Sequence, residues 1–156
     1  MRQWNPTYWN RFSNCLKWCN QRNIIIQIEV WDRFDYSQDH WDLSPWRPDN
    51  NVNYTSGQSG LANDYPAPAW KDSQPFFHTI PGMARYQKQY DLVRQFQEAF
   101  VAKMLSHSRK YDNVLYCMNN ETPTPPKWGQ YWMRFITDHA TDQGAKTCVT
   151  DMFDDV

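Results

Sequence analysis

The residue of this chain with the clearest potential for acid–base chemistry is Glu121. It follows the apolar segment 114–118 and two asparagines, Asn119 and Asn120. A carboxylic acid can donate a proton at neutral pH when apolar surroundings or a neighbouring carboxylate raise its pKa. Nearby aromatic residues such as Tyr116 could supply those surroundings. The alternative interpretation of a single Asn-Glu pair is an ordinary turn or the entry to a helix.

The composition indicates what kind of substrate such an acid would meet. Aromatic residues make up 17% of the chain and include 9 tryptophans, and much of the polarity comes from asparagine and glutamine rather than from charge. Flat rings cover the apolar C–H face of a pyranose, and side-chain amides pair with its hydroxyl groups. The chain is therefore well equipped to bind carbohydrate, although most of these rings could instead belong to a hydrophobic core.

Further polar and aromatic residues are candidates for substrate binding because they end other apolar segments. Trp31, Asp32 and Tyr36 come at the end of the first such segment, and Asp151 comes at the end of the last. An ordinary strand-end turn is the alternative for these positions. The expected members of one shared cleft are Trp31, Asp32, Tyr36, Trp41, Asn119, Asn120, Glu121 and Asp151.

Charge, hydropathy and motif content argue against several other classes of protein. The formal net charge is −1, so we expect no basic surface for nucleic acid. The longest apolar run, 24–26, is far shorter than the ~20 residues of a membrane-spanning helix. No glycine-rich phosphate loop and no Cys-x-x-Cys pair occurs, so neither a nucleotide cofactor nor a structural zinc is expected. His40 has acidic neighbours, but a solvated polar loop explains them better than a metal site.

The spacing of apolar residues predicts the elements that would position these side chains. Helices are expected at about 6–21, 86–108 and 125–144, and strands at about 24–31, 113–118 and 146–151. The repeated strand–helix–strand order predicts a parallel sheet within one domain, 1–156. The segment 32–85 is expected to be a long ordered loop, because linkers do not carry so many large rings. In such a sheet, functional residues gather at the carboxyl ends of the strands.

Alternation within the first strand segment predicts two different faces. The apolar face, which should pack against helices, carries Ile26, Ile28 and Val30. The opposite face, which would line a site or a barrel interior, carries Gln27, Glu29 and Trp31. We expect Glu29 to be buried and hydrogen-bonded on that face.

The segment Val114-Leu115-Tyr116-Cys117-Met118-Asn119-Asn120-Glu121, followed by a proline-containing loop and a helix, resembles the fourth strand of clan A retaining glycoside hydrolases. This clan includes cellulases, mannanases and β-galactosidases, which are (β/α)8 barrels. The resemblance implies that Glu121 is the acid/base and that Asn120 bonds the sugar 2-hydroxyl. It also matches the three predicted strands to barrel strands three to five, which implies an incomplete (β/α)8 TIM barrel with one long loop after its first strand.

Two features depart from the pattern of these hydrolases. Thr122 follows Glu121 where the family usually has proline. The family's nucleophile is a second glutamate at the end of strand seven, and a complete barrel takes about 250 residues. A retaining mechanism needs two carboxyl groups about 5–5.5 Å apart. We therefore expect an O-glycosidase whose nucleophile lies outside this chain, with the remainder of the same barrel as its partner, and we expect these 156 residues alone to be inactive.

Two alternatives belong to other classes. A non-catalytic carbohydrate-binding domain, or a pseudoenzyme barrel fragment, would keep the same cleft and lack the nucleophile. An α/β protein without any role in sugar chemistry would bury its tryptophans in the core. No metal and no cofactor is expected in the glycosidase. The N-terminal residues do not form a signal peptide, and secretion stays open if the chain is a segment of a longer precursor.

Overall fold

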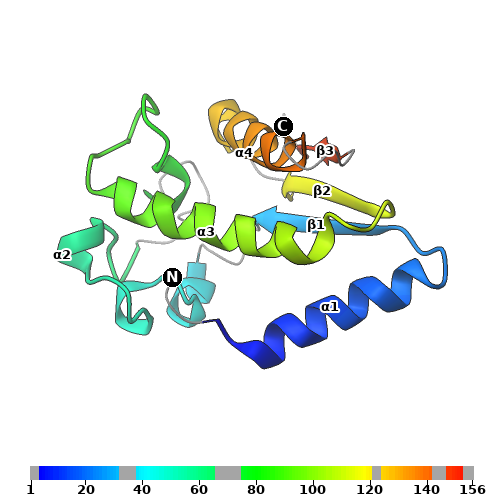
Figure 1. Ribbon diagram of the computed structural model, residues 1–156. Helices are drawn as coiled ribbons and strands as arrows, with labels where there is room; N and C mark the ends of the chain where they lie inside the picture. Colours follow the sequence, from blue (N-terminus) through cyan, green and yellow to red (C-terminus); the bar gives the residue numbers. More distant parts are fainter. Residues whose placement is uncertain (1–3, 32–37, 66–74, 121–123, 142–146, 153–156) are drawn as a thin grey trace.

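The computed structural model describes residues 4–31, 38–65, 75–120, 124–141 and 147–152. It is a mixed α/β structure with an open sheet of three parallel strands flanked by helices (Figure 1). The main elements are α1 (Pro6–Asn20), β1 (Ile26–Trp31), α3 (Tyr90–Ser108), β2 (Val114–Asn119), α4 (Pro126–Thr141) and β3 (Cys148–Thr150). The predicted helices, strands and parallel pairing are therefore confirmed, with boundaries that differ by a few residues.

The sheet has the order β1-β2-β3, which is also the order of the strands in the chain. The helices α1, α3 and α4 follow one another across the sheet in the same order as the strands (Figure 1). Helix α3 contacts both of the other two helices. The hydroxyl of Tyr116 on β2 lies 2.7 Å from the hydroxyl of Ser108 on α3, so the Tyr116 side of the sheet faces the helices.

The other face of the sheet is exposed on the two outer strands and partly or fully buried on the central strand β2. The strand register places Gln27 beside Leu115 and Cys148 in one row. The next row on this face contains Glu29, Cys117 and Thr150. Its members on the outer strands β1 and β3 are exposed. The expectation that Glu29 is buried is therefore wrong, although Cys117, its neighbour on the central strand β2, is fully buried.

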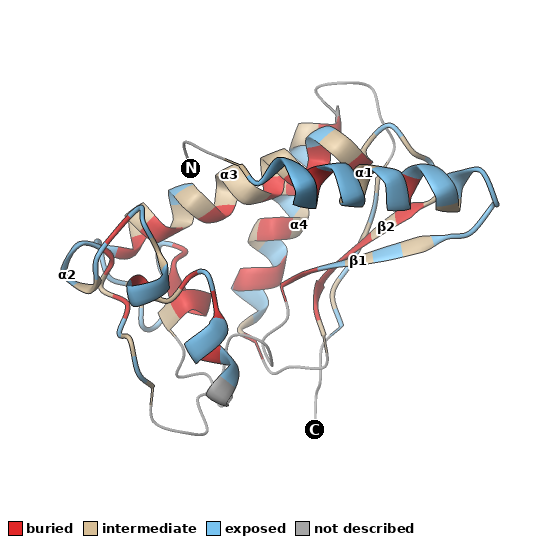
Figure 2. Cartoon of the chain, turned by 90° about the horizontal axis from the view of Figure 1, so that it is seen from below, coloured by how far each residue is buried: buried red, intermediate tan, exposed pale blue. Residues whose placement is uncertain are grey.

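Helix α1 begins where the sequence predicts. The side chain of Asn5 accepts hydrogen bonds from the backbone N–H groups of Thr7 and Tyr8 at 3.0 and 3.2 Å, and Pro6 occupies the first helical position. These are the usual signals of a helix start. The helix buries only Trp9 and Leu16 and is otherwise largely exposed (Figure 2).

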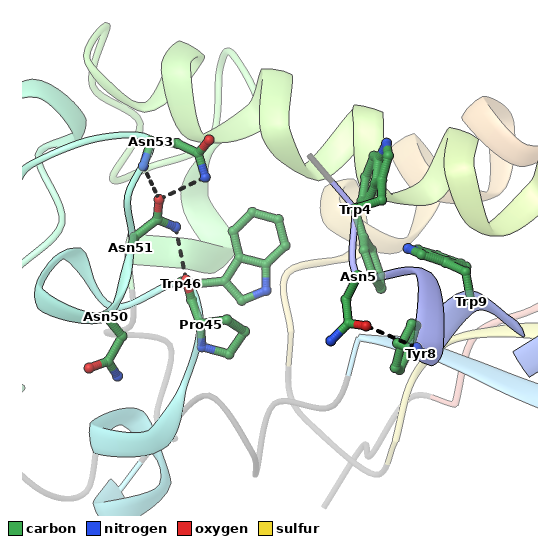
Figure 3. Close-up of a pocket in the computed structure, with 10 residues that line it drawn as sticks. Trp4, Asn5, Tyr8, Trp9, Pro45, Trp46, Asn50, Asn51 and Asn53 are labelled. Atoms are coloured by element: carbon green, nitrogen blue, oxygen red, sulfur yellow. Dashed lines mark hydrogen bonds between the residues drawn. The ribbon is translucent and has the colours of Figure 1, made fainter. Parts of the chain in front are cut away.

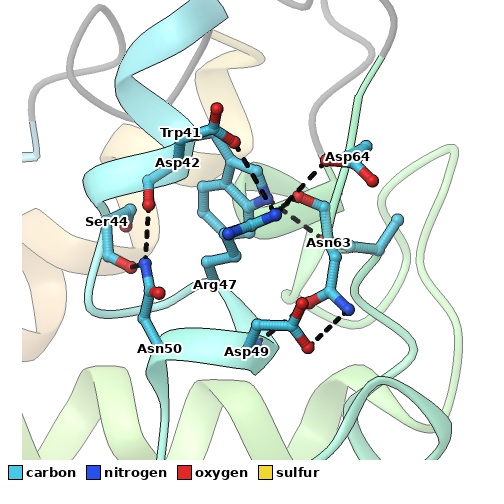
Figure 4. Close-up of polar contacts among 9 residues, drawn as sticks. Trp41, Asp42, Ser44, Arg47, Asp49, Asn50, Asn63 and Asp64 are labelled. Carbon is cyan, nitrogen blue, oxygen red and sulfur yellow. Dashed lines mark hydrogen bonds and ion pairs between the residues drawn. The ribbon is translucent and has the colours of Figure 1, made fainter.

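The predicted long loop contains short helical turns rather than one irregular coil. These are η1 (Gln38–Leu43), η2 (Pro48–Asn50), α2 (Ser56–Ser59) and η3 (Pro75–His78). Arg47 holds two parts of the loop together, because its Nε donates to the carbonyl of Asn63 at 2.8 Å and its Nη2 lies 3.4 Å from the Asp64 carboxylate (Figure 4). Asp49 and Asn63 exchange two further hydrogen bonds. The described part of the loop is thus ordered, as expected.

The core is built largely from aromatic rings that come from the strand, the loop and the helices. Trp31, the last residue of β1, is fully buried, and its ring centroid lies 4.9 Å from that of Trp132 on α4. The members of this aromatic cluster are Trp31, Trp46, Phe76, Phe100, Trp128 and Trp132. Aromatic side chains contribute large buried areas, so this cluster is the main link between the sheet and its helices.

Candidate functional site

The candidate site at the carboxyl ends of the strands contains a partly buried amide–carboxylate pair. Asn119 ends β2, and Asp151 directly follows β3. The Asn119 side-chain Nδ2 donates to Asp151 Oδ1 at 2.8 Å. Asn119 is only 1% exposed, so it is well shielded from solvent. These two predicted site residues are therefore brought together by adjacent strands.

Helix α4 approaches this pair through a glycine. The Asp151 carboxylate lies so close to Gly129 that a Cβ atom there would overlap it. Gly129 is in the first turns of α4, where the helix dipole favours a negative charge. Gly129 is not among the residues predicted from the sequence, and its only local signal is a glycine inside a strongly periodic helix. The glycine allows α4 to pack directly against the carboxylate.

Buried polar atoms near this edge retain unused hydrogen-bonding capacity. Asn119 Oδ1, Trp128 Nε1 and Trp132 Nε1 are all buried, and none has a hydrogen-bond partner within the part of the chain that the structure describes. Buried polar groups are usually paired with protein or water, and each exception needs a reason. Asn119 thus leaves a buried acceptor at the edge, and the two indole N–H groups belong to rings that pack against Trp31.

Cys117 does not add a reactive thiol to the site. Its Sγ donates to the carbonyl of Asn119 at 3.0 Å, and the side chain is fully buried. Burial raises the pKa of the Cys117 thiol, which disfavours the thiolate that would act as a nucleophile. This cysteine is a packing residue beneath the candidate site.

The remaining predicted site residues fall into three groups by burial and by whether the structure describes them. Asn120 is half-buried and directly follows β2. Glu121, Asp32 and Tyr36 lie outside the described residues. Trp31 and Trp41, both predicted to line the cleft, are buried.

Neither tryptophan offers an exposed ring for stacking. Trp31 packs among aromatic side chains of α3 and α4 instead of lining the face that carries Gln27 and Glu29. Trp41 is 2% exposed, and its Nε1 donates to the carbonyl of Ala62 at 3.1 Å. Strand alternation assigned Trp31 to the polar face, but removing a large apolar ring from water outweighs that pattern at the end of the strand.

Two general features of the described ranges bear on the class of protein. No helix within them is long and apolar enough to cross a membrane. No three histidine, cysteine, aspartate or glutamate side chains within them come together as a metal site.

The fold and this edge define an α/β domain with polar groups gathered at the carboxyl ends of a parallel sheet. The chain belongs to the DUF6298 family, which is described as a domain of unknown function and whose family model matches residues 1–153. No curated protein and no solved structure matches the chain.

Proposed function

We propose that this chain is part of a retaining glycoside hydrolase in which Glu121 acts as the acid/base. The observation that carries the proposal is that Asn120, the residue before Glu121 in the sequence, directly follows β2 at the carboxyl edge of a parallel sheet. In α/β folds this edge is where ligands bind. The adjacent pair of Asn119 and Asp151 adds fixed polar groups to the same edge.

The arrangement of helices and strands supports an incomplete (β/α)8 barrel as the finer architecture. A doubly wound sheet reverses its strand order and is covered by helices on both faces. Here the strand order does not reverse. The exposed face carries polar side chains such as Gln27 and Glu29, which would suit the interior of a barrel once further strands close it. The partner that this proposal requires is the remainder of the same barrel.

In the proposed reaction Glu121 has two roles. As an acid it protonates the oxygen of the leaving group while a second carboxylate attacks the anomeric carbon. As a base it then removes a proton from the water that hydrolyses the glycosyl intermediate. Asn120 binds the sugar and holds it more tightly in the transition state. The second carboxylate comes from outside these residues.

A non-catalytic carbohydrate-binding domain is the second candidate, and the glutamate content favours it. The sequence has only two other glutamates, Glu29 and Glu98. Glu98 lies on α3, where it bonds Tyr131 and pairs with Arg94. Glu29 is mid-strand on β1. Neither glutamate is placed to act as the nucleophile opposite a residue that follows β2. The domain would therefore bind sugar without hydrolysing it if no second carboxylate is supplied from outside these residues.

The test compares aryl glycosides with good and poor leaving groups, using the complete gene product that contains these residues. Glu121→Gln keeps the shape of the side chain and removes its proton. It should lower kcat/KM, which reports the first chemical step, by about 10²–10⁴-fold for poor leaving groups, the usual contribution of general acid catalysis, and far less for activated ones. Glu29→Gln is the matched control and should change neither rate. An equal loss of kcat/KM for both substrates in Glu121→Gln would contradict the acid role, and absence of hydrolysis by the unaltered protein would favour the binding domain.

A further inference from the structure

A second surface of the molecule is hollowed between α1 and the loop that follows β1. The pocket has a volume of about 380 Å³, which falls within the usual range for small-molecule sites. Its lining residues are Trp4, Asn5, Tyr8, Trp9, Pro45, Trp46, Asn50, Asn51, Asn53 and Phe100. Figure 3 shows Trp46 and Pro45 on one side of the pocket and Trp4, Asn5 and Trp9 on the other.

The loop wall of this pocket is held in place by its own hydrogen bonds. The Asn51 side chain donates to the carbonyl of Pro45 at 2.8 Å and accepts from the backbone N–H of Asn53 at 2.7 Å (Figure 3). The hydroxyl of Tyr54 donates to the carbonyl of Trp46 at 2.9 Å. Binding to a wall that is already ordered avoids much of the entropy that a flexible loop would lose.

The helix wall is also fixed before any ligand arrives. Asn5 caps α1 with its side-chain oxygen. Trp9 is buried between Trp4, which meets it edge-on at 5.5 Å, and His107, which stacks on it at 5.1 Å. Tyr8 remains 51% exposed at the mouth of the pocket. The pocket therefore has a rigid aromatic floor with an accessible ring at its rim.

The polar atoms that remain available are uncharged. Within the described ranges, Asn5 Nδ2, Asn50 Oδ1, Asn53 Oδ1 and the Tyr8 hydroxyl make no protein hydrogen bond, whereas Asn51 uses both ends of its amide internally. None of the lining residues carries a charge at neutral pH. Phosphorylated and carboxylated ligands would therefore bury their charge without a partner.

We propose that this pocket is a binding site for a neutral pyranose sugar. The exposed ring of Tyr8 would cover the C–H face of the sugar, the nearly buried Trp9 and Trp46 would form the floor of the pocket, and the free amide groups would bind the hydroxyls. Neither Glu121 nor Asn119 is among the residues that line the pocket. The proposed class of ligand follows from the lining residues alone and does not depend on the proposed hydrolysis. It would hold a sugar residue without cleaving it.

The experiment follows the indole N–H signals of the chain by NMR while neutral gluco-, manno-, galacto- and xylo-configured oligosaccharides are added. We expect at least one of these series to shift the signals of Trp4, Trp9 and Trp46, and an oligosaccharide of uronic acids to have no effect. Tyr8→Ala should weaken the binding about tenfold or more, the loss of roughly 1.4 kcal/mol. Trp18→Ala is the matched control, because Trp18 is 57% exposed on the same helix and does not line the pocket.

The possible results separate this site from the proposed catalytic edge. Glu121→Gln should leave the pocket shifts unchanged. Sugar-dependent shifts confined to the side-chain amides of Asn119 and Asn120 would support the edge and overturn the pocket. Unaltered affinity in Tyr8→Ala, no response to any neutral sugar, or a response to a proline-rich peptide alone would also overturn it.

Discussion

Two regions of this molecule are rich in aromatic rings, and they differ in what they leave accessible. The aromatic cluster around Trp31 is closed, because Trp31, Trp128 and Trp132 are all fully buried. The pocket between α1 and the loop is open, with Tyr8 exposed at its rim. Trp46 belongs to both, since it packs against Trp31 at 6.1 Å and also lines the pocket. A high tryptophan content therefore serves the core and a candidate sugar site in the same chain.

The largest predicted effect comes from opening the closed cluster. Trp132→Ala removes a ring that contacts Trp31, Trp128, Tyr131 and Phe135. It should lower the free energy of unfolding by about 3–5 kcal/mol, as measured by urea denaturation. Tyr8→Ala is the comparison from the open region and should change stability by less than about 0.5 kcal/mol. Similar losses in the two variants would show that the open and closed regions are not distinct.

A smaller effect is predicted where α4 meets the carboxyl edge of the sheet. Gly129→Ala should destabilise the protein by about 1–3 kcal/mol, because the new methyl group overlaps the Asp151 carboxylate. An alanine would otherwise stabilise a helix by up to about 1 kcal/mol relative to glycine. The same substitution made in an Asp151→Ala background should therefore be neutral or stabilising. A loss of stability that persists in that background would rule out the carboxylate as the cause.

The smallest effect concerns the attachment of the pocket's helix wall to α3. The Ser13 hydroxyl lies 2.6 Å from His107 Nδ1. Burial, together with Lys103 and Lys110, lowers the pKa of His107. The folded state thus disfavours protonation of His107, and the neutral imidazole contributes to the stability of the fold. This contribution is present above about pH 6.5, the usual pKa of histidine, and is lost as the pH falls through the lowered pKa of His107.

Urea midpoints measured between pH 7.5 and pH 5 would check this prediction. The wild-type protein should lose stability on acidification, and His107→Gln should lose less because it cannot take up the proton. An unchanged pH dependence in His107→Gln would show that other groups cause the acid sensitivity.

The elements of the fold could be predicted because their signals are local. Asn5 and Pro6 mark the start of α1, and the apolar segments before Trp31 and Asn120 mark two of the strands. The burial of Trp31 could not be predicted, because it depends on rings that arrive from the loop, α3 and α4. The pocket was also missed, since it joins the first turn of α1 to loop residues about forty positions later.

The candidate site was predictable only in part. Asn119 and Asp151 meet as expected, because parallel strands end at the same edge. Trp41 does not offer an exposed ring at that edge, because its indole N–H is hydrogen-bonded to a carbonyl within the loop. The close approach of Gly129 depends on how α4 packs, and the sequence carries no separate signal for it.

The most direct test of the central claim is chemical rescue of Glu121→Ala in the complete gene product. With an activated aryl glycoside, the first step needs little protonation, so a glycosyl intermediate should form and then persist for lack of a base. Azide needs no base to attack that intermediate, and it should restore turnover and yield a glycosyl azide of retained configuration. Azide that gives no rescue, while the unaltered protein hydrolyses the same substrate, would contradict the role of Glu121 as acid/base.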